Sequence, residues 1–160
     1  MRIKLLSILL GFALFIFISC NSGSAQTRKF TPADLQKLRW IEGTWRGTGD
    51  VDKPFFERYR FEGDSVLLVD GFEDETLAKV TDTTRFELKD GEFGGGSEGD
   101  RWVAKSIDDR AIEFAPAVHV RNSFRWERES NDVWKAIIMF PATKDKPARQ
   151  RVYKMERIRR

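Results

Sequence analysis

The sequence predicts an all-β domain in which short antiparallel strands form a single closed sheet. Beyond Gly43, apolar and polar residues alternate with a period of two, which is the signature of strands with one face buried. Turn-forming residues such as Glu62-Gly63-Asp64 and Lys89-Asp90-Gly91 separate the runs. A sheet of this size must close or fold over to protect its edges, so we expect a barrel of about 8–10 strands. The nine candidate strands are 44–49, 54–62, 65–72, 79–88, 101–107, 110–115, 122–128, 132–140 and 149–158.

A short helix is expected before the first strand. Thr31 is a suitable N-cap and Pro32 suits the first helical position. Leu35, Leu38 and Ile41 then fall on one face, and Gly43 ends the helix.

The alternation also predicts which side chains face the barrel interior. In 54–62, Phe55, Tyr59 and Phe61 share one face with Glu57, and in 122–128, Phe124 and Trp126 oppose Arg125. Strand 132–140 is apolar on both faces apart from Lys135, so we expect it to be the best covered strand. The Gly-rich stretch 94–99 is expected to be a mobile hairpin loop at one mouth of the barrel.

The N-terminus has the order of a bacterial export signal. Arg2 and Lys4 precede an apolar run from Leu5 to Ile18, and small polar residues follow. This run is shorter than the roughly 20 residues of a transmembrane helix. Phe17-Ile18-Ser19-Cys20 resembles a bacterial lipobox, which implies a lipidated Cys20 and a membrane anchor; the alternative is ordinary cleavage after Ala25. The expected organisation is a signal over 1–19 (or 1–25), a tether over 20–30 and a barrel domain over 31–160.

Removal of the signal changes the charge and the cysteine chemistry of the chain. The formal net charge is +3, but two of the 28 basic residues and none of the 25 acidic ones lie in the signal, so the mature value is +1. Nucleic-acid binding is not expected, because it needs a basic face of one sign. The single cysteine, Cys20, is lipidated or lost, so the domain is stabilised by packing without a disulfide. The oligomeric state stays open.

The run Leu38 to Gly47 resembles the opening of a lipocalin-type (calycin) barrel, of the kind found in secreted bacterial proteins. In those families a short helix leads into Gly-x-Trp, here Gly43-Thr44-Trp45. The resemblance implies that Trp45 plugs the closed end of the barrel and that an arginine of the last strand lies across it, with Arg149, Arg151 and Arg157 as candidates.

Residues 43–49 are also similar to the first strand of nitrobindin-like haem barrels. Those proteins ligate haem through a histidine near the C-terminus, where this chain reads Arg151-Val152-Tyr153-Lys154-Met155. We therefore expect no haem and no other cofactor. The only histidine, His119, is expected at the surface or at the barrel rim.

Two motifs that look catalytic lack the context that their chemistry needs. Gly95-Gly96-Ser97-Glu98-Gly99 matches the Gly-x-Ser-x-Gly pattern of hydrolases, but that elbow requires a strand before the serine and a helix after it. The acidic residues around Asp70 to Glu75 lack a calcium-loop pattern, so no metal site is expected. No catalytic residue is assigned.

The first functional hypothesis is a binding protein of the cell envelope that holds a small apolar or amphipathic molecule in the barrel. The expected lining residues are Phe55, Tyr59, Phe61, Phe124, Trp126 and Tyr153, with Glu57 and Arg125 as polar anchors. The alternatives are an interaction or structural protein with a filled barrel and, less favoured, an enzyme that uses the inward carboxylate of Glu57.

Overall fold

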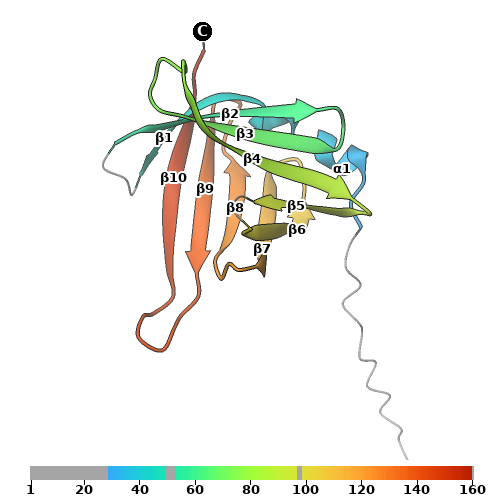
Figure 1. Cartoon of the computed structure of the whole chain (residues 1–160), viewed down its shortest axis with the longest axis vertical. Helices are drawn as coiled ribbons and strands as arrows, with labels where there is room; N and C mark the ends of the chain where they lie inside the picture. The colour runs from blue at the N-terminus through green and yellow to red at the C-terminus, as the bar shows by residue number, and fades with distance from the viewer. Residues whose placement is uncertain (1–28, 50–52, 97–98, 160) are drawn as a thin grey trace, which may run out of the picture.

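The chain forms a closed antiparallel barrel of ten strands (Figure 1), as the alternation predicted. The computed structural model describes residues 29–49, 53–96 and 99–159. Each strand pairs with the next, and β1 closes the barrel by pairing with β10, from Trp45 opposite Arg157 to Gly49 opposite Tyr153. This architecture is consistent with a lipocalin-like barrel. The strands are β1 (Gly43–Gly49), β2 (Phe55–Glu62), β3 (Val66–Phe72), β4 (Val80–Lys89), β5 (Glu92–Gly96), β6 (Arg101–Ile107), β7 (Ala111–Val118), β8 (Ser123–Arg128), β9 (Val133–Phe140) and β10 (Arg149–Arg157).

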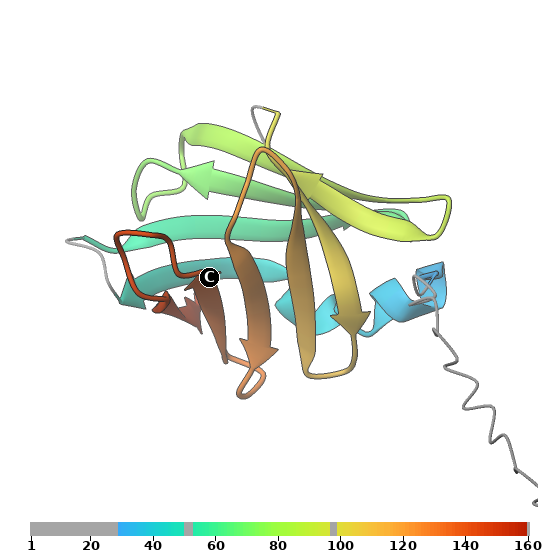
Figure 2. The same cartoon turned by 90° about the horizontal axis from the view of Figure 1, so that it is seen from below.

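The expected N-terminal helix is present but splits into two short pieces. These are α1 (Pro32–Gln36) and a turn of 3-10 helix, η1 (Arg39–Ile41). The Asp34 carboxylate accepts hydrogen bonds from the Thr31 backbone amide at 3.0 Å and from the Thr31 hydroxyl at 2.9 Å, which stabilises the first turn. Leu35, Leu38 and Ile41 are fully buried against the barrel core. Figure 2 shows the helical segment beside the strands, as a cover on one side of the barrel.

The Gly-rich stretch corrects one expectation, because much of it is a strand and not a loop. Strand β5 pairs with β4 over five residues and with β6 through Gly94 and Gly95. A Cβ on Gly95 would collide with the carbonyl oxygen of Arg85 and the Cα of Phe86. The missing side chains therefore let β4 and β5 approach closely, and the fully buried Phe93 anchors the short strand in the core.

The best covered strand is β3, so the expectation for 132–140 is wrong. Every residue of β3 except Gly71 is buried, whereas only Trp134 is buried in β9. Long arginine side chains cover the outer face of β3: Arg60 pairs with Asp70 at 3.0 Å, and the Arg58 guanidinium lies 4.8 Å from the centre of the Phe72 ring. Alternation in a sequence does not show which neighbouring side chains will fold over an outer face.

Trp45 and Arg157 build the closed end of the barrel. Trp45 is 1% exposed, and its indole N–H donates to the Ile41 carbonyl at 2.7 Å. The Arg157 guanidinium lies 4.0 Å from the Trp45 ring centre and donates to the backbone carbonyls of Glu42 and Trp40 at 2.8 and 2.9 Å. Gly43, at φ +132°, leaves room for this guanidinium, which occupies the place of a Cβ. The structure thus selects Arg157 from the three candidate arginines.

An aromatic cluster fills the barrel above this end. Trp134, which is fully buried, meets Trp45, Tyr59 and Trp126 edge to face, with ring centres 5.4 to 5.9 Å apart. These edge-to-face contacts suit the charge distribution of aromatic rings and exclude water from this level of the barrel. None of the helices among the described residues is long and apolar enough to cross a membrane.

Candidate functional site

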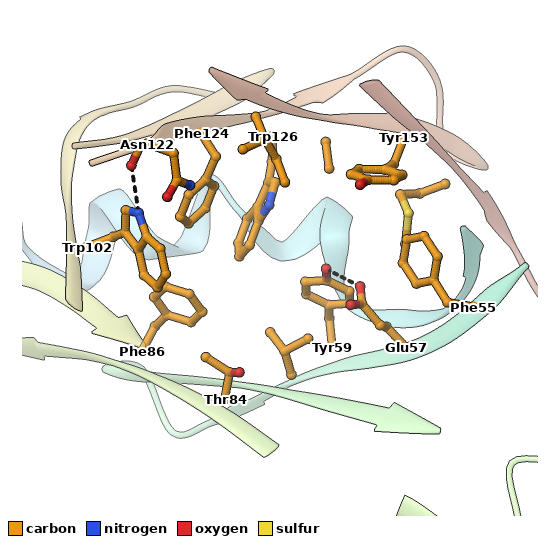
Figure 3. A pocket seen from close by; sticks show the side chains of 14 residues that line it. Phe55, Glu57, Tyr59, Thr84, Phe86, Trp102, Asn122, Phe124, Trp126 and Tyr153 are labelled. Atoms are coloured by element: carbon orange, nitrogen blue, oxygen red, sulfur yellow. Dashed lines mark hydrogen bonds between the residues drawn. The ribbon is translucent and has the colours of Figure 1, made fainter. Parts of the chain in front are cut away.

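A cavity of about 320 Å³ opens among the inward side chains on the other side of the aromatic cluster (Figure 3). Its volume lies at the lower end of the range of small-molecule sites, roughly 300–1,000 Å³. Half of its lining is aromatic: Phe55, Tyr59, Phe86, Trp102, Phe124, Trp126 and Tyr153. The remaining lining residues are Glu57, Val69, Thr84, Asn122, Ala136, Ile138 and Met155.

Ring-to-ring contacts hold the aromatic walls in place. Tyr59 and Trp126, which also contact Trp134, meet each other at 5.5 Å and 88°. At the opposite side, Phe55 and Tyr153 are perpendicular, with ring centres 5.6 Å apart. The Phe55 ring lies against Gly47, its cross-strand partner, in the space that a side chain there would fill. The Trp102 indole N–H donates to the Asn122 carbonyl at 2.9 Å.

Glu57 supplies the acidic group of the cavity, and its hydrogen-bond partner is Tyr59. Residues two apart on a strand share a face, so β2 directs both side chains inward. The Tyr59 hydroxyl donates to Glu57 Oε2 at 2.7 Å. Burial raises the pKa of the Glu57 carboxyl above its usual 4.5; the hydrogen bond from Tyr59 opposes this rise, and the negative charge of Asp82 adds to it. Burial and the neighbouring Glu57 also raise the pKa of the Tyr59 hydroxyl well above 10.0.

A second carboxylate lies on the same inner face, two strands away. The register places Glu57 opposite Gly71 and Gly71 opposite Asp82. Because Gly71 has no side chain, the Asp82 carboxylate lies over its inner side, where a Cβ would be. Asp82 is exposed and lies outside the cavity lining, so it acts on Glu57 through its charge alone.

The cavity has an acidic character among the residues that the structure describes. Its described lining contains Glu57 and no arginine, lysine or histidine. Arg151 lies on the same strand as Tyr153, two residues toward the β9–β10 turn, and its guanidinium stands 5.9 Å from the centre of the Phe140 ring outside the lining.

The structure brings most of the expected lining residues together. Phe55, Glu57, Tyr59, Phe124, Trp126 and Tyr153 all line the cavity. Phe61 does not: it shares the inner face of β2 but lies nearer the closed end, beneath the Arg39 guanidinium at 4.3 Å.

Arg125 corrects the expectation of a second polar anchor. It points away from the cavity, opposite Phe124 and Trp126, and its Nε donates to Glu127 at 2.9 Å on the outer face. The alternation of 122–128 already assigns Arg125 to that face, so its place in the cavity conflicted with the pattern itself.

Sequence reasoning missed several lining residues on strands whose facing it left open. Thr84 and Phe86 on β4, and Trp102 on β6, belong to this group. The alternation within β4 could have indicated that Thr84 and Phe86 share one face of the strand. Asn122 precedes β8, but it begins the candidate strand 122–128, whose alternation places it on the face of Phe124 and Trp126, so its position at the cavity was also readable.

The described residues hold no group of three or more His, Cys, Asp or Glu side chains suited to a metal ion. His119 is exposed and follows β7. Gly95 and Gly96 belong to β5 and β6 follows at Arg101, and the described residues between the two strands hold no helix of the kind that a hydrolase elbow needs. Cys20, both candidate cleavage positions and Ser97 lie outside the described residues.

Comparison with known proteins adds no relative: no protein-family model matches this chain, and no curated protein matches it.

Proposed function

We propose that this protein binds a small, largely apolar molecule inside its barrel. The observation that carries the proposal is the aromatic cavity of about 320 Å³, which contains a carboxyl group at one wall. Apolar walls with a few placed polar groups are typical of small-molecule sites. In this arrangement the aromatic rings supply binding energy and Glu57 orients the ligand.

The volume sets the size of the ligand. An apolar protein cavity of about 150 Å³ accommodates a benzene molecule. A cavity of about 320 Å³ suits a ligand about twice that size, such as a bicyclic aromatic compound or a short branched chain. Long-chain lipids exceed this space unless part of the chain stays outside.

Two observations favour binding over the alternative of a filled barrel with an interaction surface. Phe56, which alternates with the inward Phe55 and Glu57 on β2, is buried and so does not form part of an apolar exterior. The exposed large hydrophobic residues among those described are Val80, Val118 and Val152, and they lie on β4, β7 and β10, which are not neighbours in the sheet. Scattered single residues of this kind are usual on soluble surfaces.

Binding is also favoured over catalysis by the same carboxyl group. An enzyme on this barrel needs two titratable groups that converge on a substrate. Glu57 and Tyr59 do converge, but the Tyr59 hydroxyl proton is already donated to Glu57. The pair therefore offers one polar anchor and not an acid beside an independent base.

The proposed place of action is the bacterial cell envelope, with an anchor at Cys20. The basic head, the short apolar run and the lipobox-like Phe17-Ile18-Ser19-Cys20 support this proposal. Its test is membrane fractionation of the full chain and of Cys20→Ala. We expect the substitution to release the protein from the membrane fraction, and a variant that stays membrane-bound would exclude lipidation as the anchor.

A cavity-filling substitution tests the binding function. Ala136 lines the cavity, whereas its neighbour Ile137 pairs with Arg125 and Val152 on the outer face. We expect Ala136→Trp to abolish binding of a neutral naphthalene dye, followed by dye fluorescence, and Ile137→Trp to retain it. Equal binding by the two variants would show that the dye binds elsewhere and would remove the support for a cavity ligand.

A further inference from the structure

We propose that the cavity selects a cation: its ligand is an amine whose ammonium group binds at Glu57 while its apolar part lies among the aromatic rings. This inference rests on the proposed binding function and names its ligand class. Three features of the cavity lead to it: the carboxyl group without a basic partner, the nearby negative charge of Asp82 and the aromatic rings of the walls.

Glu57 has no basic partner among the described residues of the cavity lining. An inward-facing acidic residue in a barrel usually pairs with a basic one, because an unpaired carboxylate is costly away from water. Here the partner of Glu57 is a neutral hydroxyl, that of Tyr59. Among the described residues no donor reaches Oε1, so one carboxylate oxygen is left for a ligand. An ammonium group supplies both the charge and the donor.

A second negative charge, that of Asp82, acts on Glu57. Asp82 lies over Gly71, beside Glu57 in the cross-strand row, and its negative charge adds to the rise in the pKa of Glu57. Asp82 is exposed, so solvent weakens its effect, but two carboxylates on one face still repel each other and attract a cation. An anionic ligand group at Glu57 meets repulsion from both.

Aromatic rings surround the Glu57 carboxyl group in the cavity wall. Phe55 and Tyr59 flank Glu57 along β2, and Tyr153 packs against Phe55. A cation within about 6 Å of an aromatic ring centre is attracted to the ring face, and the gain rises when the site is dry. Aromatic rings around a carboxylate therefore suit the ammonium group and the hydrocarbon of one amine together.

Basic residues outside the cavity lining define the rival ligand. Arg121, Lys146 and Arg149 border a separate hollow beside the β9–β10 turn, near Asn122. A ligand with an acidic head would place that head there and its apolar part in the cavity. The three basic side chains are exposed, and exposed charges contribute little binding energy. The carboxylate in the cavity therefore decides which ligand head group is preferred.

Three probes with one naphthalene ring and different head groups separate these ligand classes: naphthylmethylamine, naphthylmethanol and naphthylacetic acid. We expect isothermal titration calorimetry near neutral pH to show the amine binding about tenfold more tightly than the alcohol, with the acid weakest. In Glu57→Gln the amine should lose this advantage while the alcohol keeps its affinity. Glu127→Gln, which removes an acid from the outer face of β8, is the matched control and should retain the preference.

The outcomes distinguish this inference from the binding function on which it rests. Three results would overturn the amine assignment while leaving a cavity ligand in place. These are equal affinity for the amine and the alcohol, tightest binding of the acid, and a preference for the amine that survives Glu57→Gln. If none of the three probes binds, and the neutral dye also fails to distinguish Ala136→Trp from Ile137→Trp, the binding function itself is wrong.

Discussion

The Tyr59 hydroxyl donates a 2.7 Å hydrogen bond to the Glu57 carboxyl group inside the barrel. The two residues are neighbours on one face of β2, so the strand itself sets the contact. A tyrosine stabilises the buried carboxyl group by a hydrogen bond but does not neutralise its charge. The negative charge of Glu57 therefore remains until the carboxylate takes up a proton or a ligand neutralises it.

The first prediction concerns the pH dependence of stability. The pKa of Glu57 is raised in the folded protein, so the folded state holds its proton more tightly than the unfolded state. The resulting stabilisation is complete below the unfolded pKa, near 4.5, and is lost as the pH rises through the folded value. We expect Glu57→Gln to gain stability relative to the wild type as the pH rises, measured as the difference in Tm from acid to neutral pH.

Tyr59→Phe is the companion variant. It removes the donor and leaves the carboxyl group, so it should cost about 1–2 kcal/mol of unfolding free energy and increase the loss of stability with rising pH. A constant difference in Tm between Glu57→Gln and the wild type at all pH values would contradict the raised pKa.

The second prediction concerns the closed end of the barrel. Arg157 donates to the backbone carbonyls of Glu42, Trp40 and Asn131 and covers the Trp45 ring. Arg157→Ala leaves these acceptors without their donors and should lower the unfolding free energy by about 3 kcal/mol, measured by urea unfolding with tryptophan fluorescence.

Arg157→Lys keeps the charge but loses the planar fork, so it should restore about 1 kcal/mol at most. A lysine variant as stable as the wild type would show that charge alone holds this end together. Arg149→Ala, at the other end of β10, is the control and should have little effect.

The third prediction concerns strand β5. A Cβ on Gly95 meets the backbone of Arg85 and Phe86, so Gly95→Ala should push β5 away from β4 and cost about 2 kcal/mol or more. Gly63→Asn is the control, because Gly63 has open space around it and asparagine tolerates its positive φ. Faster hydrogen exchange of the β5 amides in Gly95→Ala would locate the effect, and equal stability of the two variants would argue against close packing at Gly95.

The fourth prediction concerns the helix cap. A hydrogen bond from Lys37, helped by those from Thr31 and opposed by burial, lowers the pKa of Asp34 from 3.8 to about 2. The stabilisation is therefore present above about pH 3.8 and is lost as the pH falls through about 2. Asp34→Asn should cost about 1 kcal/mol at neutral pH.

The difference in stability between Asp34→Asn and the wild type should shrink between pH 4 and pH 2 in thermal unfolding, because the wild-type carboxylate takes up its proton in this range. A deficit that stays constant over this range would mean that the charge of Asp34 does not contribute to the cap.

The extent to which the site was predictable differs from residue to residue. Phe55, Glu57 and Tyr59 lie on one strongly alternating strand, so their shared face was readable from local sequence. Phe61 obeys the same alternation yet lies outside the cavity, because its height in the barrel depends on how the strands tilt and where the closed end lies. Phe86 and Trp102 come from β4 and β6, which do not pair with β2, so the curvature of the whole sheet decides that they reach the same cavity.

The sequence by itself determined the fold class, the capped helical segment and the inward face of β2. These properties depend on neighbours two to four residues apart, and such local preferences do not need the rest of the chain. Only the tertiary structure decided that Arg157 covers Trp45, that the glycines of β5 pair as a strand, and that Glu57 faces a cavity without a basic lining residue among those described. The Arg157–Trp45 contact and the cavity lining join distant segments through the register and closure of the barrel, which no local pattern shows. The β5 glycines pair with nearby residues of β4, but they carry no alternating side chains from which a strand could be read.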